Sequence, residues 1–361
     1  MSYLRRILLS LLLTATVLAT VLAGDLTAAR ADVPLPNFDR LQPSADPVRL
    51  TSSPRPLNVS YTHNGKTHTL QDYLHRTAQG LVVLDGTQVV KEWYAPGYSA
   101  DSVFQSWSIA KGFTAHAIGI AISEGKIGSL DDPVATYVPE LARHAYGPVT
   151  IRNLLRMTSG IKWDGQLDDI SLQVVLSMGW TTTLKYAAAQ TSAVPQGTTY
   201  NYNSMNSAVL ALVLARATGR PYHQYVQDKI WGPAGMASTA FVGNDSHGNA
   251  MGYCCYYARD RDFARWGLTL LRGGQANGRQ VIPASWLAYA STPNPLQPDH
   301  DVTGGVLDGS DGYWYGGFGG QIVYVSTRHR VVIVKTTLYS VHEDETLPAM
   351  RATAAEVAAT R

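Results

Sequence analysis

The sequence predicts a fold of two lobes, one α/β and one all-α. Three observations support this prediction: β-rich segments near both chain ends, a long and mainly helical middle, and a composition suited to large cores. The 361 residues are 45% hydrophobic and 16% charged, which excludes disordered and coiled-coil proteins. We therefore expect an antiparallel sheet built from both chain ends, with flanking helices and a helical lobe inserted at roughly residues 131–265.

The first 31 residues have the pattern of a secretory signal peptide. Met1–Arg6 is short and basic, and Ile7–Ala23 is an unbroken run of apolar and small residues. Ala29-Arg30-Ala31 has the small-x-small pattern of a cleavage site, and Val21-Leu22-Ala23 is a second possible one. A retained membrane anchor is the alternative. We predict that residues 1–31 are removed and that the mature chain is secreted or otherwise extracytoplasmic, without stable membrane insertion.

The formal net charge of +2 is accounted for by three arginines and one aspartate in residues 1–31. The mature chain is therefore neutral, which argues against nucleic-acid binding. The histidines show no clustered ligand spacing, so no metal or other cofactor is predicted. The two cysteines, Cys254 and Cys255, are adjacent, and such a pair closes a disulfide only by distorting the peptide between them. Packed thiols are the first prediction for this pair and a vicinal disulfide is the second.

The strands are predicted at the two ends of the mature chain. Residues 32–67 form an N-terminal extension, with an extended segment at Asp32–Pro56 followed by a hairpin arm that turns at Asn64-Gly65. A second hairpin joins Gly80–Leu84 to Gln88–Tyr94. Near the C-terminus we predict two further strands and a final helix, at Gln321–Val325, Arg330–Lys335 and His342–Arg361.

The helices predicted in the middle have recognisable ends. A helix covers Ile109–Ser123 after a polar loop. Thr150 caps the N-terminus of a helix over Ile151–Met157, and Gly160 follows its end. Another helix covers Asn206–Thr218 and ends at Gly219.

Ser108 and Lys111 form the first candidate for catalysis, at the start of the predicted Ile109–Ser123 helix. A spacing of three places the hydroxyl and the amine on one helix face, within reach of each other. The N-terminus of a helix disfavours the ammonium form, so a partly desolvated Lys111 can act as a base. A serine hydroxyl needs such a partner to become a nucleophile. Alone, however, this spacing is a weak signal, since Ser123–Lys126 and Thr182–Lys185 share it.

Two further motifs strengthen the candidate. Tyr202 lies in the segment Tyr200-Asn201-Tyr202-Asn203-Ser204, just before an apolar helix, where a phenol can relay protons. The glycine-rich segment 315–321 comes immediately before a strand. Its glycines let the backbone approach a substrate, and one of its N–H groups can join that of Ser108 in an oxyanion hole.

The order S-x-A-K, Y-x-[NS] and a glycine-rich strand start resembles the serine β-lactamase-like family of class C β-lactamases, D-alanyl-D-alanine carboxypeptidases and serine esterases. Supporting stretches are 130–134, 150–160 and 261–267, and the resemblance covers roughly Gly80 to Lys335. The segments 106–111 and 317–321 are most similar to the 6-aminohexanoate-dimer hydrolase and esterase branch. The resemblance implies a β-lactamase/transpeptidase-like fold over residues 68–361, with the active site between its lobes.

The resemblance also assigns roles. Ser108 would be the acylating nucleophile, Lys111 its base, and Tyr202 the proton shuttle. Tyr202 is preferred over Tyr200, which takes the aromatic place two residues before the tyrosine of the family. The backbone N–H groups of Ser108 and Phe318 would form the oxyanion hole. Substrate contacts are expected from a further group of residues: Trp107, Ser204, Tyr315 and Gly317.

Departures from the family pattern bear on the substrate. Ser204 stands where lactamases and carboxypeptidases usually carry an asparagine, although Ser204-Met205-Asn206 could instead be the S-x-N motif of other penicillin-binding enzymes. Tyr315 stands where a K-T-G or H-x-G motif supplies a cation for a substrate carboxylate. Lys335-Thr336-Thr337 imitates K-T-G but lacks the glycine and lies at the far end of a strand.

The sequence therefore predicts a secreted serine hydrolase that cleaves small carboxylic esters or simple amides without a cofactor. A D-alanyl-D-alanine carboxypeptidase or β-lactamase is the alternative within enzymes. A non-catalytic ligand-binding homologue is the alternative of another class. The sequence leaves the oligomeric state open.

Overall fold

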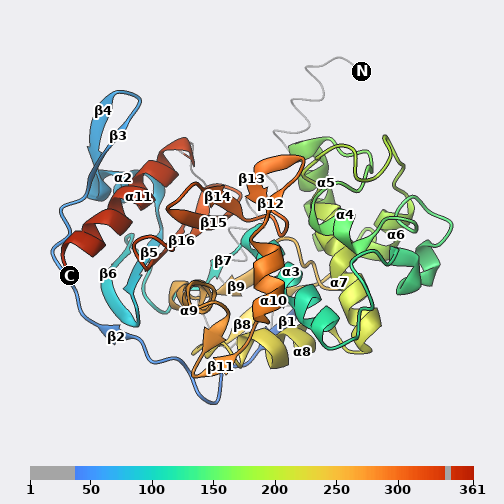
Figure 1. Cartoon of the computed structure of the whole chain (residues 1–361), viewed down its shortest axis with the longest axis horizontal. Helices are drawn as coiled ribbons and strands as arrows, with labels where there is room; N and C mark the ends of the chain where they lie inside the picture. The colour runs from blue at the N-terminus through green and yellow to red at the C-terminus, as the bar shows by residue number, and fades with distance from the viewer. Residues whose placement is uncertain (1–36, 338–342) are drawn as a thin grey trace.

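A computed structural model describes residues 37–337 and 343–361 of the chain, so the predicted signal peptide lies outside the described residues. The fold has an α/β lobe and a helical lobe side by side (Figure 1). In the described residues no helix is both long and apolar enough to cross a lipid bilayer.

The largest sheet combines strands from both ends of the chain, as predicted. Within the described residues it has nine strands in the order β12-β13-β14-β15-β16-β17-β5-β6-β2. The pairs are antiparallel except for β2 with β6. The bounds along the sheet are β12 (Pro293–Asn294), β13 (Gln297–Asp301), β14 (Val306–Asp308), β15 (Gly312–Gly317), β16 (Gln321–Ser326), β17 (Val331–Thr336), β5 (Gly80–Asp85), β6 (Gln88–Tyr94) and β2 (Thr51–Ser52).

The central strands are apolar on both faces because each face is covered by helices. Along β5, Val82 and Leu84 belong to the core shared with α9 (Asp260–Leu271), whereas Leu81 and Val83 belong to the core beneath α2 (Leu70–Thr77) and α11 (Glu343–Ala359). The predicted hairpin and final helix are confirmed, with small shifts of their ends.

The helical lobe lies between the two halves of the sheet in sequence. Asn203 and Thr150 cap α7 and α4 through side-chain hydrogen bonds, and Gly219 ends α7 in a left-handed conformation. The helix predicted at Ile109–Ser123 has those bounds in the structure. The helices of this middle segment are α3 (Ile109–Ser123), α4 (Ile151–Leu155), α5 (Gly165–Ser177), α6 (Thr183–Ala188), α7 (Ser204–Thr218) and α8 (Tyr222–Val226), with short helical turns at Val134–Thr136, Pro139–Leu141 and Gln227–Trp231; α10 (Ala284–Ala290) follows α9.

A second sheet was not predicted. It has the strand order β1-β8-β9-β7 in the described part of the chain. β1 therefore pairs with a strand about two hundred residues away. β1 itself lies within Asp32–Pro56, a segment that we predicted to be extended without assigning it a partner strand. The bounds are β1 (Phe38–Leu41), β7 (Phe104–Gln105), β8 (Ala240–Gly243) and β9 (Tyr256–Ala258), and two separate hairpins are β3 (Ser60–His63) with β4 (Lys66–Thr69) and β10 (Gln275–Ala276) with β11 (Arg279–Gln280).

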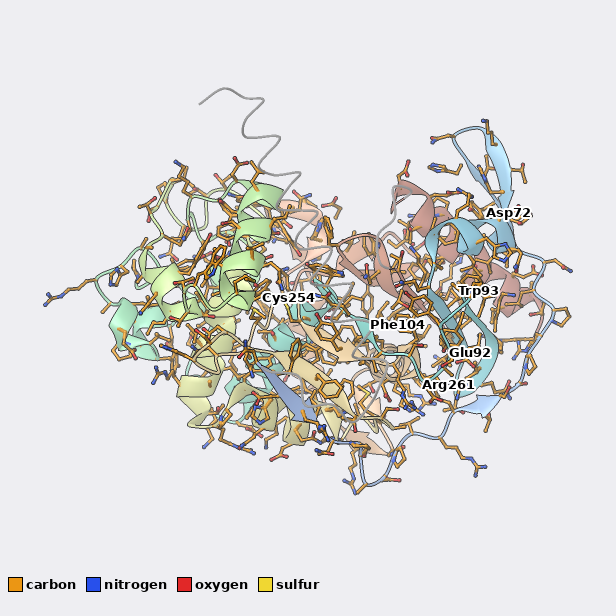
Figure 2. The ribbon with its side chains drawn as sticks, turned by 180° about the vertical axis from the view of Figure 1, so that it is seen from behind. Asp72, Glu92, Trp93, Phe104, Cys254 and Arg261 are labelled. Carbon is orange, nitrogen blue, oxygen red and sulfur yellow. A yellow bond between two sulfur atoms is a disulfide. The ribbon has the colours of Figure 1, made fainter. Side chains whose placement is uncertain are left out.

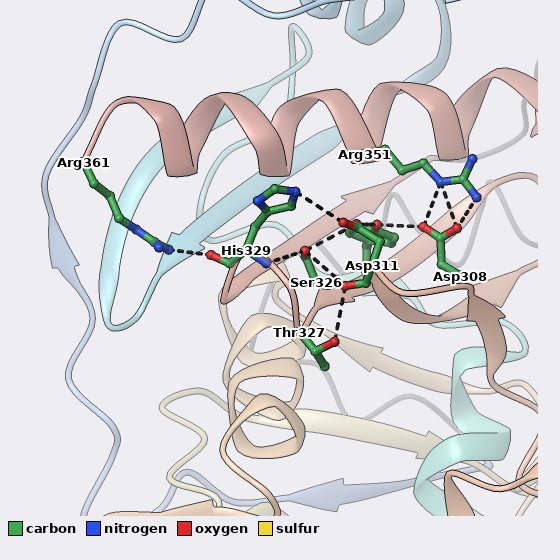
Figure 3. A network of polar contacts seen from close by, with 8 residues as sticks. Asp308, Asp311, Ser326, Thr327, His329, Arg351 and Arg361 are labelled. Atoms are coloured by element: carbon green, nitrogen blue, oxygen red, sulfur yellow. Dashed lines mark hydrogen bonds and ion pairs between the residues drawn. The ribbon is translucent and has the colours of Figure 1, made fainter.

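Ion pairs fix the outer helices to the sheet. Arg351 of α11 binds the Asp308 carboxylate in the β14–β15 hairpin, and the neighbouring Asp311 lies 3.3 Å from Nε2 of His329 (Figure 3). On the other face, Nε of Arg261 in α9 donates to Glu92 of β6 over 2.8 Å, and these two residues are neighbours in Figure 2. The two helix layers are thus held to the sheet by charge as well as by apolar packing.

Glu345 fixes the N-terminal end of α11 to α2 and to strand β3. Its carboxylate accepts hydrogen bonds from the Arg76 guanidinium over 2.8 and 2.9 Å and from the Tyr61 hydroxyl over 2.7 Å. The hydrogen bonds from Arg76 are the main cause that lowers the pKa of Glu345 to about 2. The carboxylate is therefore ionised in the folded protein over the whole neutral and mildly acidic range.

Replacing Glu345 by glutamine is expected to destabilise the fold by about 1–3 kcal/mol at neutral pH, because charged hydrogen bonds are lost in a buried place. The folded pKa lies below the unfolded value of about 4.3, so this stabilisation is present above that value and is lost as the pH falls toward 2. Thermal unfolding at pH 7 and pH 3 should show a smaller pH effect in Glu345→Gln than in wild type. Glu140→Gln, at an exposed ion pair, is the control. Equal pH effects in Glu345→Gln and wild type would contradict this account.

Candidate active site

Ser108 and Lys111 lie within hydrogen-bonding distance at the start of α3. Nζ of Lys111 is 2.8 Å from Oγ of Ser108, and it also donates to the carbonyl of Tyr253 over 3.2 Å. The Lys111 side chain is buried, with 4% of its surface exposed, whereas Ser108 is half-buried. The spacing of three therefore has the geometric effect that we predicted. A hydroxyl at the solvent side and an amine beneath it are arranged for proton transfer.

The loop that carries Ser108 is held by the chain segment around the two cysteines. Oγ of Ser106 donates to the carbonyl of Cys254 over 2.7 Å, and the backbone N–H of Ser106 donates to the carbonyl of Tyr256 over 2.8 Å. Trp107 has a φ of 46°, a left-handed conformation that is uncommon for a residue with a Cβ. This sharp turn brings the chain from β7 into α3, with Ser108 as the N-cap residue of the helix.

Cys254 and Cys255 form a disulfide, so the first prediction of packed thiols is wrong and the second holds. Both side chains are buried, and both sulfurs approach Oε1 of Gln173, at 3.1 Å from Cys254 and 3.5 Å from Cys255. The two side chains thus point to one side of the backbone, which allows the bond. Figure 2 shows Cys254 near the middle of the molecule. The disulfide lies in the same segment whose carbonyls contact Lys111 and Ser106.

Tyr202 reaches the same place from the helical lobe. It lies in the loop before α7, next to Asn203, whose side chain accepts from the backbone N–H of Met205 over 2.8 Å. The centroid of the Tyr202 ring is 4.7 Å from Nζ of Lys111. The start of α3 and the loop before α7 therefore bring together the three groups to which the resemblance assigns the chemistry.

The end of β15 approaches the Ser108 loop from the sheet. A Cβ added at Gly317 would lie 2.6 Å from the carbonyl oxygen of Ser106 and 2.9 Å from Cβ of Trp107, so glycine is required for this approach. The Phe318 ring meets the Trp107 ring edge-on, with 5.4 Å between centroids. Phe318 is thus placed beside the nucleophile loop, where a backbone N–H can serve an oxyanion.

Replacing Gly317 by alanine is expected to lower the activity by about 10²-fold, because the added methyl group would push β15 away from the Ser106 carbonyl. The measurement is kcat/KM for a p-nitrophenyl ester together with the melting temperature. Gly128→Ala is the control, since its added Cβ would meet no backbone atom but only side-chain ends, the Asp132 carboxylate at 3.0 Å and the Tyr137 hydroxyl at 3.8 Å. Full activity in a folded Gly317→Ala variant would show that this contact does not set the site geometry.

A pocket of about 460 Å³ opens beside Ser108. Four of the predicted site residues line it: Ser108, Tyr202, Gly317 and Phe318. Sequence reasoning missed Asp169, His300 and Leu347 in its wall, because none of them belongs to a recognisable motif. The remaining lining residues include apolar and aromatic side chains of the sheet, among them Val306, Trp314 and Ile322.

Tyr315 is placed differently from the prediction. Its side chain is 3% exposed and enters the core on the other face of β15, where the hydroxyl lies 2.9 Å from Oγ1 of Thr303 and 3.3 Å from Nε2 of His116. Strand side chains alternate between faces, so Tyr315 points away from the face of Trp314 and Gly316. Its ring fills the space left by Gly112 of α3, where an added Cβ would lie 2.9 Å from it. The expectation of a direct substrate contact by Tyr315 is therefore wrong.

The other two residues expected to contact the substrate, Trp107 and Ser204, are not among the residues that line the pocket, although each contacts one of them. Trp107 forms the turn and packs against Phe318, as described above. Ser204 is buried at the first position of α7, and its backbone N–H donates to Oδ1 of Asp169 over 3.3 Å. Oδ1 of Asp169 also accepts from Nε1 of Trp163 over 3.1 Å, which fixes this carboxylate in the pocket wall.

The hydroxyl of Ser108 contacts a buried amine, beside a tyrosine ring and the glycine-rich end of a strand, which is the arrangement that the resemblance to serine hydrolases predicts. The chain belongs to the β-lactamase family, whose members are serine hydrolases: the family model described as "Beta-lactamase" matches residues 67–356. The resemblance and the fold class inferred from the sequence are thereby confirmed.

Relatives of known name carry several hydrolytic activities. The 6-aminohexanoate-dimer hydrolase of Paenarthrobacter ureafaciens is 28% identical over 254 residues, which cover 67% of this chain and 64% of that protein. Esterase EstB of Burkholderia gladioli is 29% identical over 203 residues, covering 50% of this chain and 47% of that protein. The chain thus spans less than two thirds of the length of these relatives. A solved structure described as "Putative 6-aminohexanoate-dimer hydrolase from Bacillus anthracis" has the same fold, with a TM-score of 0.76 and 20% identity over 90% of both chains.

Proposed function

We propose that the protein is a secreted hydrolase that cleaves carboxylic esters or simple amides through an acyl-enzyme on Ser108. The observation that supports it most directly is the 2.8 Å contact between Oγ of Ser108 and the buried amine of Lys111. The names of the relatives support hydrolysis of amide or ester bonds in general. Secretion rests on the pattern of residues 1–31, outside the described part of the chain.

The proposed reaction has two half-reactions. Oγ of Ser108 attacks the acyl carbon while its proton moves to Nζ of Lys111, and the oxyanion binds the N–H groups of Ser108 and Phe318. The hydroxyl of Tyr202 gives a proton to the leaving oxygen or nitrogen and is reprotonated from Lys111, which leaves an ester on Ser108. A water molecule then repeats the attack with the proton transfers reversed, releasing the acid and the free Ser108 hydroxyl.

The pocket wall supports a neutral or amine-bearing substrate. Its described lining residues include the carboxylate of Asp169 and no lysine or arginine. A penicillin or a peptidoglycan stem carries a carboxylate, which would meet no matching cation there and would be repelled by Asp169. The aromatic and aliphatic side chains of the wall suit an apolar acyl group.

A panel of three substrate types tests the proposal: short-chain p-nitrophenyl esters, linear anilides and a chromogenic cephalosporin. We expect the esters to be hydrolysed fastest and the cephalosporin slowest. A fluorophosphonate probe followed by peptide mass spectrometry should label the peptide that contains Ser108. Faster cephalosporin hydrolysis would overturn the substrate assignment in favour of a β-lactamase or carboxypeptidase. Labelling of another residue, or turnover of no substrate, would overturn the catalytic proposal and favour a ligand-binding homologue.

A further inference from the structure

Lys335 is a buried lysine that the proposed reaction does not use. Its side chain is 0% exposed on β17, and Nζ donates to the carbonyl of Gly320 over 2.8 Å. Nζ also lies 5.3 Å from the centroid of the Tyr73 ring, within the range of a cation–π contact. Burying an ammonium group is costly unless oriented acceptors compensate for the lost water. The positions of the Gly320 carbonyl and the Tyr73 ring therefore indicate which part of the site Lys335 supports.

The carbonyl that Lys335 binds belongs to Gly320, the last residue of the turn that carries the oxyanion donor. The backbone N–H of Gly320 donates to the carbonyl of Gly317 over 3.1 Å, so residues 317–320 form a four-residue turn with Phe318 at its second position. Gly319 has a φ of 83°, the value of the third position in a type II turn. The direction of the Phe318 N–H therefore depends on how this turn is held.

Side chains from β16 and β17 hold the far end of the turn. Besides the contact of Lys335 with Gly320, Nε2 of Gln321 donates to the carbonyl of Thr337 over 2.6 Å. Lys335 is also linked to the pocket wall through its aromatic neighbour Tyr73. The Tyr73 hydroxyl donates over 2.7 Å to Oγ1 of Thr346, a residue that lines the pocket. Glycines at 319 and 320 supply no side chains that could fix the turn themselves.

We propose that Lys335 is a positioning residue for the oxyanion hole. Its ammonium holds the Gly320 carbonyl, and the closed turn then directs the Phe318 N–H toward the acyl oxygen of the substrate. The inference rests on the proposed function, since it gives Lys335 a part in the reaction of Ser108. A lysine on β17 thereby contributes to the reaction without touching the substrate.

The test compares Lys335→Met, which keeps the chain length and removes the charge, with Lys335→Arg, which keeps a charged donor. Lys91→Met, on the neighbouring part of the same sheet, is the control. Activity is measured with a p-nitrophenyl ester and expressed per active site titrated with the fluorophosphonate, so that misfolded protein does not count. Affinity for an aryl boronic acid reports on binding of a tetrahedral, transition-state-like adduct.

We expect Lys335→Met to lower kcat by about 10–10²-fold with KM within about threefold of wild type, because an oxyanion contact acts in the transition state. The boronic acid should lose affinity by the same factor as kcat/KM. Lys335→Arg should recover most of the loss, and Lys91→Met should behave as wild type. If Lys335→Met does not fold, Lys335→Gln serves the same comparison.

Two outcomes would overturn the inference. The first is an unchanged kcat per titrated site with only a lower melting temperature, which is what a purely structural lysine would show. The second is a Lys335→Arg variant that folds, titrates fully and is as slow as Lys335→Met. In both cases the proposed function is kept if the probe labels wild-type protein at Ser108 and wild-type protein hydrolyses esters. A wild-type protein that is not labelled there overturns the proposed function itself.

Discussion

Replacing Ser108 by alanine is expected to lower kcat for ester hydrolysis by about 10⁴-fold or more, to the level of the oxyanion contacts and binding alone. The acyl-enzyme cannot form without Oγ, and the amine of Lys111, 2.8 Å away in wild type, has no hydroxyl left to activate. The measurement is steady-state hydrolysis of a p-nitrophenyl ester, with the fluorophosphonate adduct followed in parallel.

The matched control is Ser123→Ala, which removes the hydroxyl of the second S-x-x-K sequence. That hydroxyl donates to the carbonyl of Ile120 over 2.7 Å at the other end of α3, so the control should keep wild-type turnover and labelling. A Ser108→Ala protein that hydrolyses the ester as fast as wild type would exclude Ser108 as the nucleophile.

Replacing Tyr202 by phenylalanine is expected to lower kcat by about 10²–10⁴-fold, the usual contribution of a general acid and base. The ring, which lies 4.7 Å from Nζ of Lys111, stays in place, and only the hydroxyl that passes the proton is removed. The loss should be smaller for a p-nitrophenyl ester than for an alkyl ester or an anilide, because p-nitrophenolate leaves without being protonated.

Tyr200→Phe is the matched control for this prediction. The Tyr200 ring packs at 5.6 Å from that of His300, and its hydroxyl has no role in the proposed reaction. We expect activity close to wild type. If Tyr200→Phe were slow and Tyr202→Phe fast, the proton shuttle would have to be reassigned to Tyr200.

Local signals predicted the elements that carry the nucleophile and the base. The Ile109–Ser123 helix and the hairpin around Asp85-Gly86 depend on periodicity and turn residues that lie close together in the sequence, and the structure has both. The sheet of β1, β8, β9 and β7 was missed because its strands are short and pair across long separations, as Asp39 does with Val242. A segment of four residues carries too little pattern to reveal such a partner.

The same distinction applies to the site. Ser108 and Lys111 are brought together by one helical turn, which the sequence specifies. Asp169 and His300 reach the pocket through tertiary packing, and no sequence motif or residue spacing predicts that they line it. Tyr315 was expected to contact the substrate because a motif gives the position of a residue along β15 but not the direction of its side chain. That direction depends on how β15 packs against α3, where Gly112 leaves room for the ring.

The pocket draws on distant parts of the chain, and this has a consequence for how its selectivity can change. Of the described lining residues, α3 and its preceding loop supply Ser108, whereas most of the wall comes from residues 300–347. Mutations in that C-terminal part can reshape the acyl-binding space while the serine and lysine keep their contact. The fold therefore separates the pocket wall, which can vary, from the Ser108–Lys111 pair, which must be kept. One reactive centre could thus be adapted to many acyl groups by evolution or by directed engineering.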